Sequence, residues 1–140
     1  MIKGIHNFSE IGKLQRVLLH RPGREIEALT PSTMERLLFD DVPFLKAAQE
    51  EHDAFADLLR KNGVEVIYYE EETAKALSTQ RIRQDFADRM IELSFIESEG
   101  MKEAISRFLM SLSPEEMVEK IISGVRRADL GEGRTGSLSD

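Results

Sequence analysis

The sequence predicts an α/β fold for residues 1–77, followed by an α-helical bundle over 78–126. Two β-rich segments flank one strongly amphipathic helical segment in the first part, as in a strand–helix–strand unit. Beyond Tyr69 the apolar residues recur only at the spacing of helices, which predicts the bundle. A chain of 140 residues is long enough for one domain with a real core.

The first predicted strand covers residues 14–20, within the segment KLQRVLLHRPG. Four of its residues are apolar, and the segment stops at Pro22-Gly23, which is typical of a turn. We therefore expect a largely buried strand that ends in a turn; its apolar residues are Leu14, Val17, Leu18 and Leu19.

The most strongly amphipathic segment predicts a helix over residues 43–62, with Pro43 in its first turn. Gly63 can adopt the left-handed backbone conformation that commonly ends a helix. The β-rich segment VEVIYY, which follows it, predicts a second strand over 64–69. One face of this helix carries the apolar stripe Phe44, Ala48, His52, Phe55 and Leu59.

Four further helical segments follow the second strand, beginning with a short helix over 70–77. Ser113, Pro114 and Glu116 form the sequence pattern of a capping box that starts the last helix. Residues 127–140 are rich in glycine and predict a flexible tail. The stripes expected to face the core are Ile82, Phe86, Met90 and Leu93; then Met101, Ala104, Ile105, Phe108 and Leu109; then Met117, Val118, Ile121, Ile122 and Val125.

Charge and composition exclude several classes of function. The net charge is −7 and the basic residues are spread along the chain, so a nucleic-acid surface is not expected. No apolar run approaches the ~18 residues of a membrane span, and the N-terminus lacks the apolar segment of a secretory signal. We therefore expect a cytoplasmic protein. The absence of cysteine excludes disulfides, zinc–thiolate sites and a cysteine nucleophile within these residues.

The adjacent carboxylates Asp40 and Asp41 are candidate binding residues with three possible roles. They could contribute to a metal site, cap the following helix, or receive a cation such as a guanidinium. A metal needs further converging ligands, and the surrounding loop has no calcium-binding pattern, so no metal is predicted. The other two roles remain open from the residues alone.

The histidines give no complete catalytic group. His20 ends the first strand, a common position for site residues, although it could equally stabilise the turn. His52 lies on an apolar stripe and is expected to be a core histidine, and His6 gives no usable signal. Without a serine or cysteine partner, these residues form no nucleophilic constellation.

Three motifs carry a resemblance to the bacterial arginine deiminases: a strand ending in HRPG, then LLFDD, then EHDAF. The segments FIESEGMKEAI and LSPEEMVEKIISGV resemble the helical insertion of that family more loosely. The resemblance implies a pentein-type propeller of αβ modules with an inserted helical bundle. It also implies hydrolysis of L-arginine to L-citrulline and ammonia through a cysteine thiolate, without a cofactor, in a homo-oligomer.

The resemblance also assigns roles to residues of this chain. Leu38 would line the arginine pocket, and Asp41 would add negative charge near it. The catalytic cysteine, histidine and acidic residues would lie beyond Asp140, so we expect an N-terminal part of the enzyme that is inactive alone and has no catalytic residue. A noncatalytic interaction module and a part of another guanidine-modifying hydrolase are the alternatives.

Overall fold

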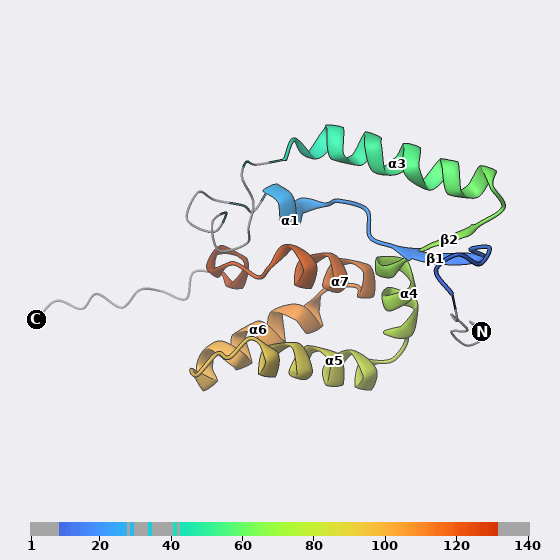
Figure 1. Ribbon diagram of the computed structural model, residues 1–140. Coiled ribbons are helices and arrows are strands. Elements are labelled where there is room, and N and C mark those ends of the chain that lie inside the picture. The colour runs from blue at the N-terminus through green and yellow to red at the C-terminus, as the bar shows by residue number, and fades with distance from the viewer. Residues whose placement is uncertain (1–8, 28, 30–33, 35–40, 42, 132–140) are drawn as a thin grey trace, which may run out of the picture.

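A computed structural model of the chain describes residues 9–27, 29, 34, 41 and 43–131 (Figure 1). In order along the chain, its elements are β1 (Arg16–Leu19), α1 (Arg24–Glu27), α3 (Leu45–Lys61), β2 (Glu65–Tyr68), α4 (Tyr69–Ala76), α5 (Gln80–Leu93), α6 (Glu99–Ser111), α7 (Pro114–Ser123) and the 3-10 helix η1 (Arg127–Leu130). None of these helices is both long and apolar enough to cross a membrane.

Strands β1 and β2 form a parallel pair, with Arg16 opposite Glu65 and Leu19 opposite Tyr68. Helix α3 lies between them in sequence and packs against β2, so the predicted strand–helix–strand unit is confirmed. In Figure 1, α3 lies on one side of the strand pair and the helices α5 and α6 lie on the other. Because the strands are parallel, their carboxyl ends meet at one edge of the sheet.

The prediction that the first strand is largely buried was wrong. Side chains of β1 alternate between exposed and half-buried, and Leu18 keeps 53% of its surface exposed. The described helices α3 and α4 contact β2 more extensively than β1. A two-stranded sheet covered in this way leaves apolar side chains of β1 at the surface of the described part of the chain.

Helix α3 begins two residues later than predicted, because Phe44 adopts extended backbone angles and stands at the N-cap position. Pro43 therefore precedes the helix instead of lying in its first turn, and Asp41 lies three residues ahead of the N-cap. Asp40 lies outside the described residues. The predicted end is confirmed, since Gly63 has a φ of 76° directly after the helix and its C-cap.

The apolar stripe of α3 is only partly buried. Ala56 is the buried residue of this helix, whereas His52 and Leu59 are half-buried. Phe44 and Phe55, which were both predicted to face the core, keep 71% and 51% of their surfaces exposed. The helix covers a narrow sheet, so a stripe as wide as the sequence suggests has too little surface to pack against.

The core of the described chain lies among α4 to α7. Its buried residues are Ala74, Leu77, Ala87, Ile91, Ile105, Leu109, Met117 and Val118. Ala74 belongs to α4 and Leu77 caps it, so the short helix after β2 packs with the bundle. The stripes predicted for α6 and α7 are confirmed, but α5 buries Ala87 and Ile91 instead of Ile82 and Leu93.

Helix starts in the bundle follow the sequence closely. The hydroxyls of Thr79 and Ser98 accept backbone N–H groups at the starts of α5 and α6. Ser113 and Glu116 form the predicted capping box of α7, with Pro114 in its first turn. Each cap satisfies donors that a helix terminus otherwise leaves unpaired.

The beginning of the predicted flexible tail is folded. Residues 127–130 form η1, whose Leu130 packs against the core. The Asp129 carboxylate accepts a hydrogen bond from the N–H of Arg126 at 2.7 Å and pairs with Lys120 at 2.8 Å. These local contacts outweigh the low apolar content that predicted flexibility. Residues 132–140 lie outside the described part, and the division at 77/78 and 126/127 stays a prediction.

Candidate functional site

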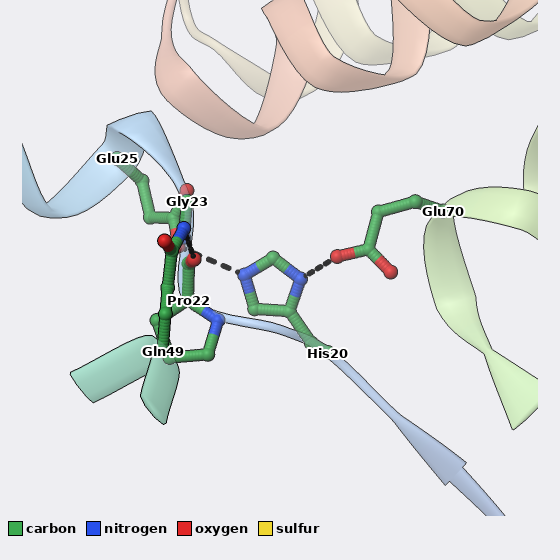
Figure 2. A network of polar contacts seen from close by, with 6 residues as sticks. All are labelled: His20, Pro22, Gly23, Glu25, Gln49 and Glu70. Carbon is green, nitrogen blue, oxygen red and sulfur yellow. Dashed lines mark hydrogen bonds and ion pairs between the residues drawn. The ribbon is translucent and has the colours of Figure 1, made fainter. Parts of the chain in front are cut away.

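The carboxyl ends of the two parallel strands bring His20 and Glu70 together. His20 is the first residue after β1, and Glu70 lies in the first turn of α4, directly after β2. Figure 2 shows the imidazole ring between the two segments that leave the sheet at this edge. Polar residues at the carboxyl edge of a parallel sheet are a common setting for binding sites.

Both ring nitrogens of His20 contact carboxylates (Figure 2). Nδ1 is hydrogen-bonded to Oε1 of Glu70, and Nε2 lies 3.0 Å from Oε1 of Glu25 in α1. The same Glu25 oxygen accepts the backbone N–H of Gly23 at 2.6 Å. The ring therefore links β1 to α1 and to α4.

These contacts change the acid–base properties of the group. Burial alone would lower the pKa of His20, but its hydrogen bonds with Glu25 and Glu70, together with the attraction of their charges, raise it above 6.5. Burial would raise the pKa of Glu25, but backbone N–H groups, chiefly that of Gly23, and the His20 ring lower it below 4.5. Both shifts favour a charged ring beside a charged Glu25 carboxylate.

Helix α3 holds the same turn from the other side. The side-chain amide of Gln49 donates to the carbonyl oxygen of Pro22 at 2.8 Å (Figure 2), and Arg21 makes a two-pronged ion pair with Asp53. Gln49 and Asp53 are four residues apart and so lie on one face of α3. The HRPG turn, residues 20–23, is thereby fixed between α1, α3 and α4.

A cavity of about 510 Å³ opens beside this turn. Four carboxylates and three basic side chains contribute to its wall, which therefore carries charges of both signs beside apolar surface. The described residues that line it include no hydroxyl and no thiol, so the wall offers charge and hydrogen bonds rather than a nucleophile. These lining residues are His20, Arg21, Pro22, Gly23, Arg24, Glu25, Glu27, Leu45, Gln49, Glu70, Glu119 and Ile122.

The residues predicted to bind substrate lie apart from this cavity or outside the description. Leu38 falls among residues that the structure does not describe, as does His6. Asp41 is exposed and is not among the described residues of the cavity wall. His52 is half-buried, with its ring 5.8 Å from that of Tyr68, and its buried Nε2 has no hydrogen-bond partner among the described residues, so the expected core histidine is only partly found. Within the described ranges, no three possible metal ligands gather in one place.

Glu25 and Glu70 are the site residues that sequence reasoning missed. Each stands in an ordinary charged segment, REIE and YEEE, where a carboxylate on a solvated face is the simplest interpretation. Their distance from His20 in sequence, five and 50 residues, gives no periodic signal. For Glu70, the position just after the second parallel strand could have indicated that it would meet a residue following the first.

A family profile and several known proteins that match this chain carry the same description. The family profile described as arginine deiminase matches residues 35–138. The arginine deiminase of Limosilactobacillus fermentum is 52% identical over 130 residues, which cover 93% of this chain and 32% of that protein. Those of Streptococcus agalactiae serotype Ia and Streptococcus equi subsp. zooepidemicus are 50% and 52% identical over 129 residues, or 91% of this chain. The chain thus spans about a third of the length of these relatives.

Proposed function

The chain belongs to the arginine deiminase family, and on that basis we propose that it is the N-terminal part of an enzyme that hydrolyses L-arginine to L-citrulline and ammonia. The observation that carries the proposal is the identity of about one half to named arginine deiminases over more than nine tenths of the chain. We extend the proposal to a cytoplasmic homo-oligomer that needs no cofactor and binds arginine rather than nucleic acid or membrane.

The proposed chemistry uses a cysteine thiolate that attacks the guanidinium carbon of arginine and expels ammonia. A histidine then helps water to release citrulline from the covalent intermediate. A delocalised cation is a poor electrophile, so this reaction needs a strong nucleophile and fixed counter-charges. The 140 residues contain no cysteine, and the described wall of the His20 cavity has no substitute for one. We therefore assign the nucleophile to the remainder of the family-length polypeptide.

The contribution of this chain is structural support and part of the substrate pocket. We propose that Leu38 packs against the aliphatic stem of arginine and that Asp41 adds negative charge near its guanidinium. Asp41 is exposed and lies three residues ahead of Phe44, the N-cap of α3, and this exposure supports access of a charged ligand to its carboxylate. We also propose that the parallel strands β1 and β2 form part of the first module of a pentein-type propeller.

The test is an assay of citrulline formation with two purified proteins, the 140-residue chain and the complete polypeptide encoded by the gene. We expect the complete protein to convert arginine and the 140-residue chain to release none above background. Replacing the arginine with dimethylarginine distinguishes the related guanidine-modifying hydrolases. Arginine-dependent ammonia from the 140-residue chain would overturn the assignment of the nucleophile, and an inactive complete protein would overturn the proposed activity.

A second candidate is a noncatalytic module that binds a partner protein. The exposed apolar side chains of Leu18, Phe44 and Phe55 favour it, because exposed apolar surface commonly marks an interface. Sedimentation of the 140-residue chain, alone and after Phe44→Ser and Phe55→Ser substitution, tests for such association. Normal arginine turnover by the complete protein, together with a monomeric 140-residue chain, would reject this candidate.

A further inference from the structure

The protonation of His20 follows from its two neighbours. Each ring nitrogen faces a carboxylate oxygen, Nδ1 facing Glu70 and Nε2 facing Glu25. An ionised carboxylate can only accept hydrogen bonds, so both contacts are hydrogen bonds only when both ring nitrogens carry a proton. The arrangement in Figure 2 is therefore that of an imidazolium between two carboxylates.

The two carboxylates would respond differently to the loss of one ring proton. Glu25 has a second donor, because its Oε1 also accepts the N–H of Gly23. Glu70 has less support: its Oε2 is buried and has no hydrogen-bond partner among the described residues. Removing the ring donor from Glu70 would leave a partly buried carboxylate poorly satisfied, which costs more free energy than removing it from Glu25.

We propose that His20 is a pH-sensitive link between α1 and α4, in which loss of a proton from Nε2 releases Glu25 while Nδ1–H keeps its bond to Glu70. The proton leaves to solvent, which reaches the ring because the His20 side chain is 40% exposed. In the neutral ring the Nε2 lone pair faces a carboxylate oxygen at a distance that suited a hydrogen bond. That contact becomes repulsive, and α1 moves away from the ring.

Glu25 and Glu70 are the charged groups that take part in this response, because the other charged groups around the cavity pair elsewhere or make no contact with the ring. Arg21 is engaged by Asp53, and Arg24 of α1 lies 3.4 Å from Glu119 of α7. Glu27 also lines the cavity from α1, but among the described residues it makes no hydrogen bond or ion pair with the ring, and α3 contributes Leu45 and Gln49, which carry no charge. Because Arg24 reaches Glu119, α1 stays attached to α7 when it leaves the ring, and the α1 side of the cavity widens.

The experiment measures the imidazole ¹⁵N chemical shifts of the 140-residue chain between pH 5 and pH 9. The sequence has three histidines, so His20→Asn and His52→Asn variants assign the signals. We expect His20 to titrate above 6.5 and its neutral form to carry the proton on Nδ1. A pKa at or below 6.5, or a neutral proton on Nε2, would overturn the proposal.

Three substitutions separate the roles of the surrounding carboxylates. Glu70→Gln should lower the pKa of His20 and move the neutral proton to Nε2, whereas Glu25→Gln should lower the pKa and leave that proton on Nδ1. Glu27→Gln is the matched control, since it removes a charge from the same helix and cavity without touching the ring. It should change neither the pKa of His20 nor the nitrogen that carries the proton in the neutral ring. Equal effects of all three variants would contradict the assignment.

The result does not depend on enzyme activity, because every group involved lies in this chain. If Glu70→Gln fails to fold, as judged by circular dichroism at pH 6, the wild-type tautomer decides the question alone. The proposal and the proposed function can therefore fail separately.

Discussion

Arg21 and Asp53 form a forked ion pair: Nε of the arginine donates to Oδ1 at 2.7 Å, and Nη2 donates to Oδ2 at 2.8 Å. The pair joins the residue that follows His20 to the middle of α3, 32 residues further along the chain. The Arg21 guanidinium holds the pKa of Asp53 below its usual value of 3.8. This contact fixes both the rotation and the position of α3 relative to the HRPG turn.

Arg21→Lys should loosen α3 although the charge is kept. A lysine ammonium is a compact charge and cannot reproduce two parallel hydrogen bonds to one carboxylate. We expect a lower melting temperature and faster amide hydrogen exchange along α3. Arg24→Lys is the control, since Arg24 is well exposed and makes a single longer contact of 3.4 Å. Equal exchange rates in the two variants would show that the fork does not position the helix.

Leu109→Ala should be among the most destabilising single changes. Leu109 is only 1% exposed and lies in the core formed by α4 to α7. Truncating a buried leucine to alanine costs about 2–5 kcal/mol, through lost transfer free energy and the cavity left behind. Urea denaturation measures the difference in the free energy of unfolding. Leu93→Ala, at a position that is 51% exposed, should change it by less than about 0.5 kcal/mol.

The ion pair that secures η1 should weaken in acid. Lys120 and the N–H of Arg126 lower the pKa of Asp129 below 3.8, so its folded pKa lies under its unfolded value. The resulting stability is fully present above pH 3.8 and is lost as the pH falls through the folded pKa. Melting temperatures of the wild type and Asp129→Asn should differ at pH 6 and converge near pH 2. A difference in melting temperature that persists at low pH would argue against the ionised pair as its source.

Leu38→Ala, tested in the complete enzyme, should raise KM for arginine. Removing a leucine contact with the aliphatic stem costs on the order of 1–3 kcal/mol, which corresponds to roughly fivefold to 150-fold in affinity. A smaller loss in kcat would follow if looser binding also misplaces the guanidinium. Steady-state kinetics with the neighbouring variant Leu37→Ala would show whether the effect is specific. Unchanged kinetics in Leu38→Ala would remove this residue from the pocket.

Asp41→Asn separates charge from shape at the second proposed substrate contact. Asparagine is nearly isosteric with aspartate but carries no charge. If the charge helps to hold arginine, kcat/KM should fall about tenfold, equivalent to about 1.4 kcal/mol, while the melting temperature barely moves. Glu51→Gln removes a charge from the exposed face of α3 and serves as the control. Unchanged kinetics in Asp41→Asn would leave that residue with no role in binding.

Much of the fold was predictable because its signals are local. The capping box at Ser113 and Glu116, the left-handed Gly63 and the helical stripes of α6 and α7 each arise from residues a few positions apart. Burial was harder to predict, because it depends on what covers each face. Leu18 and Phe44 have the apolar character of core residues, yet the described elements do not cover them.

The site shows the same contrast between local and distant information. The position of His20 at the end of a strand was visible in the sequence, but its partners were not. Glu70 reaches the ring only because the strands are parallel and in register. Glu25 reaches it because α1 turns back over Gly23. Neither relationship leaves a repeating pattern in the sequence, since both depend on how the folded chain brings separate segments together.

The parallel pairing of β1 with β2 also sets the order of events during synthesis. Arg16 and its partner Glu65 are 49 residues apart. At translation rates of about 5–20 residues per second, β1 exists for roughly 2–10 s before β2 has been made. During that interval Leu18 belongs to an unpaired apolar strand, the kind of segment that nascent chains aggregate through. Ribosome-bound chains that end before Glu65 should therefore be the ones that a chaperone binding exposed apolar segments retains.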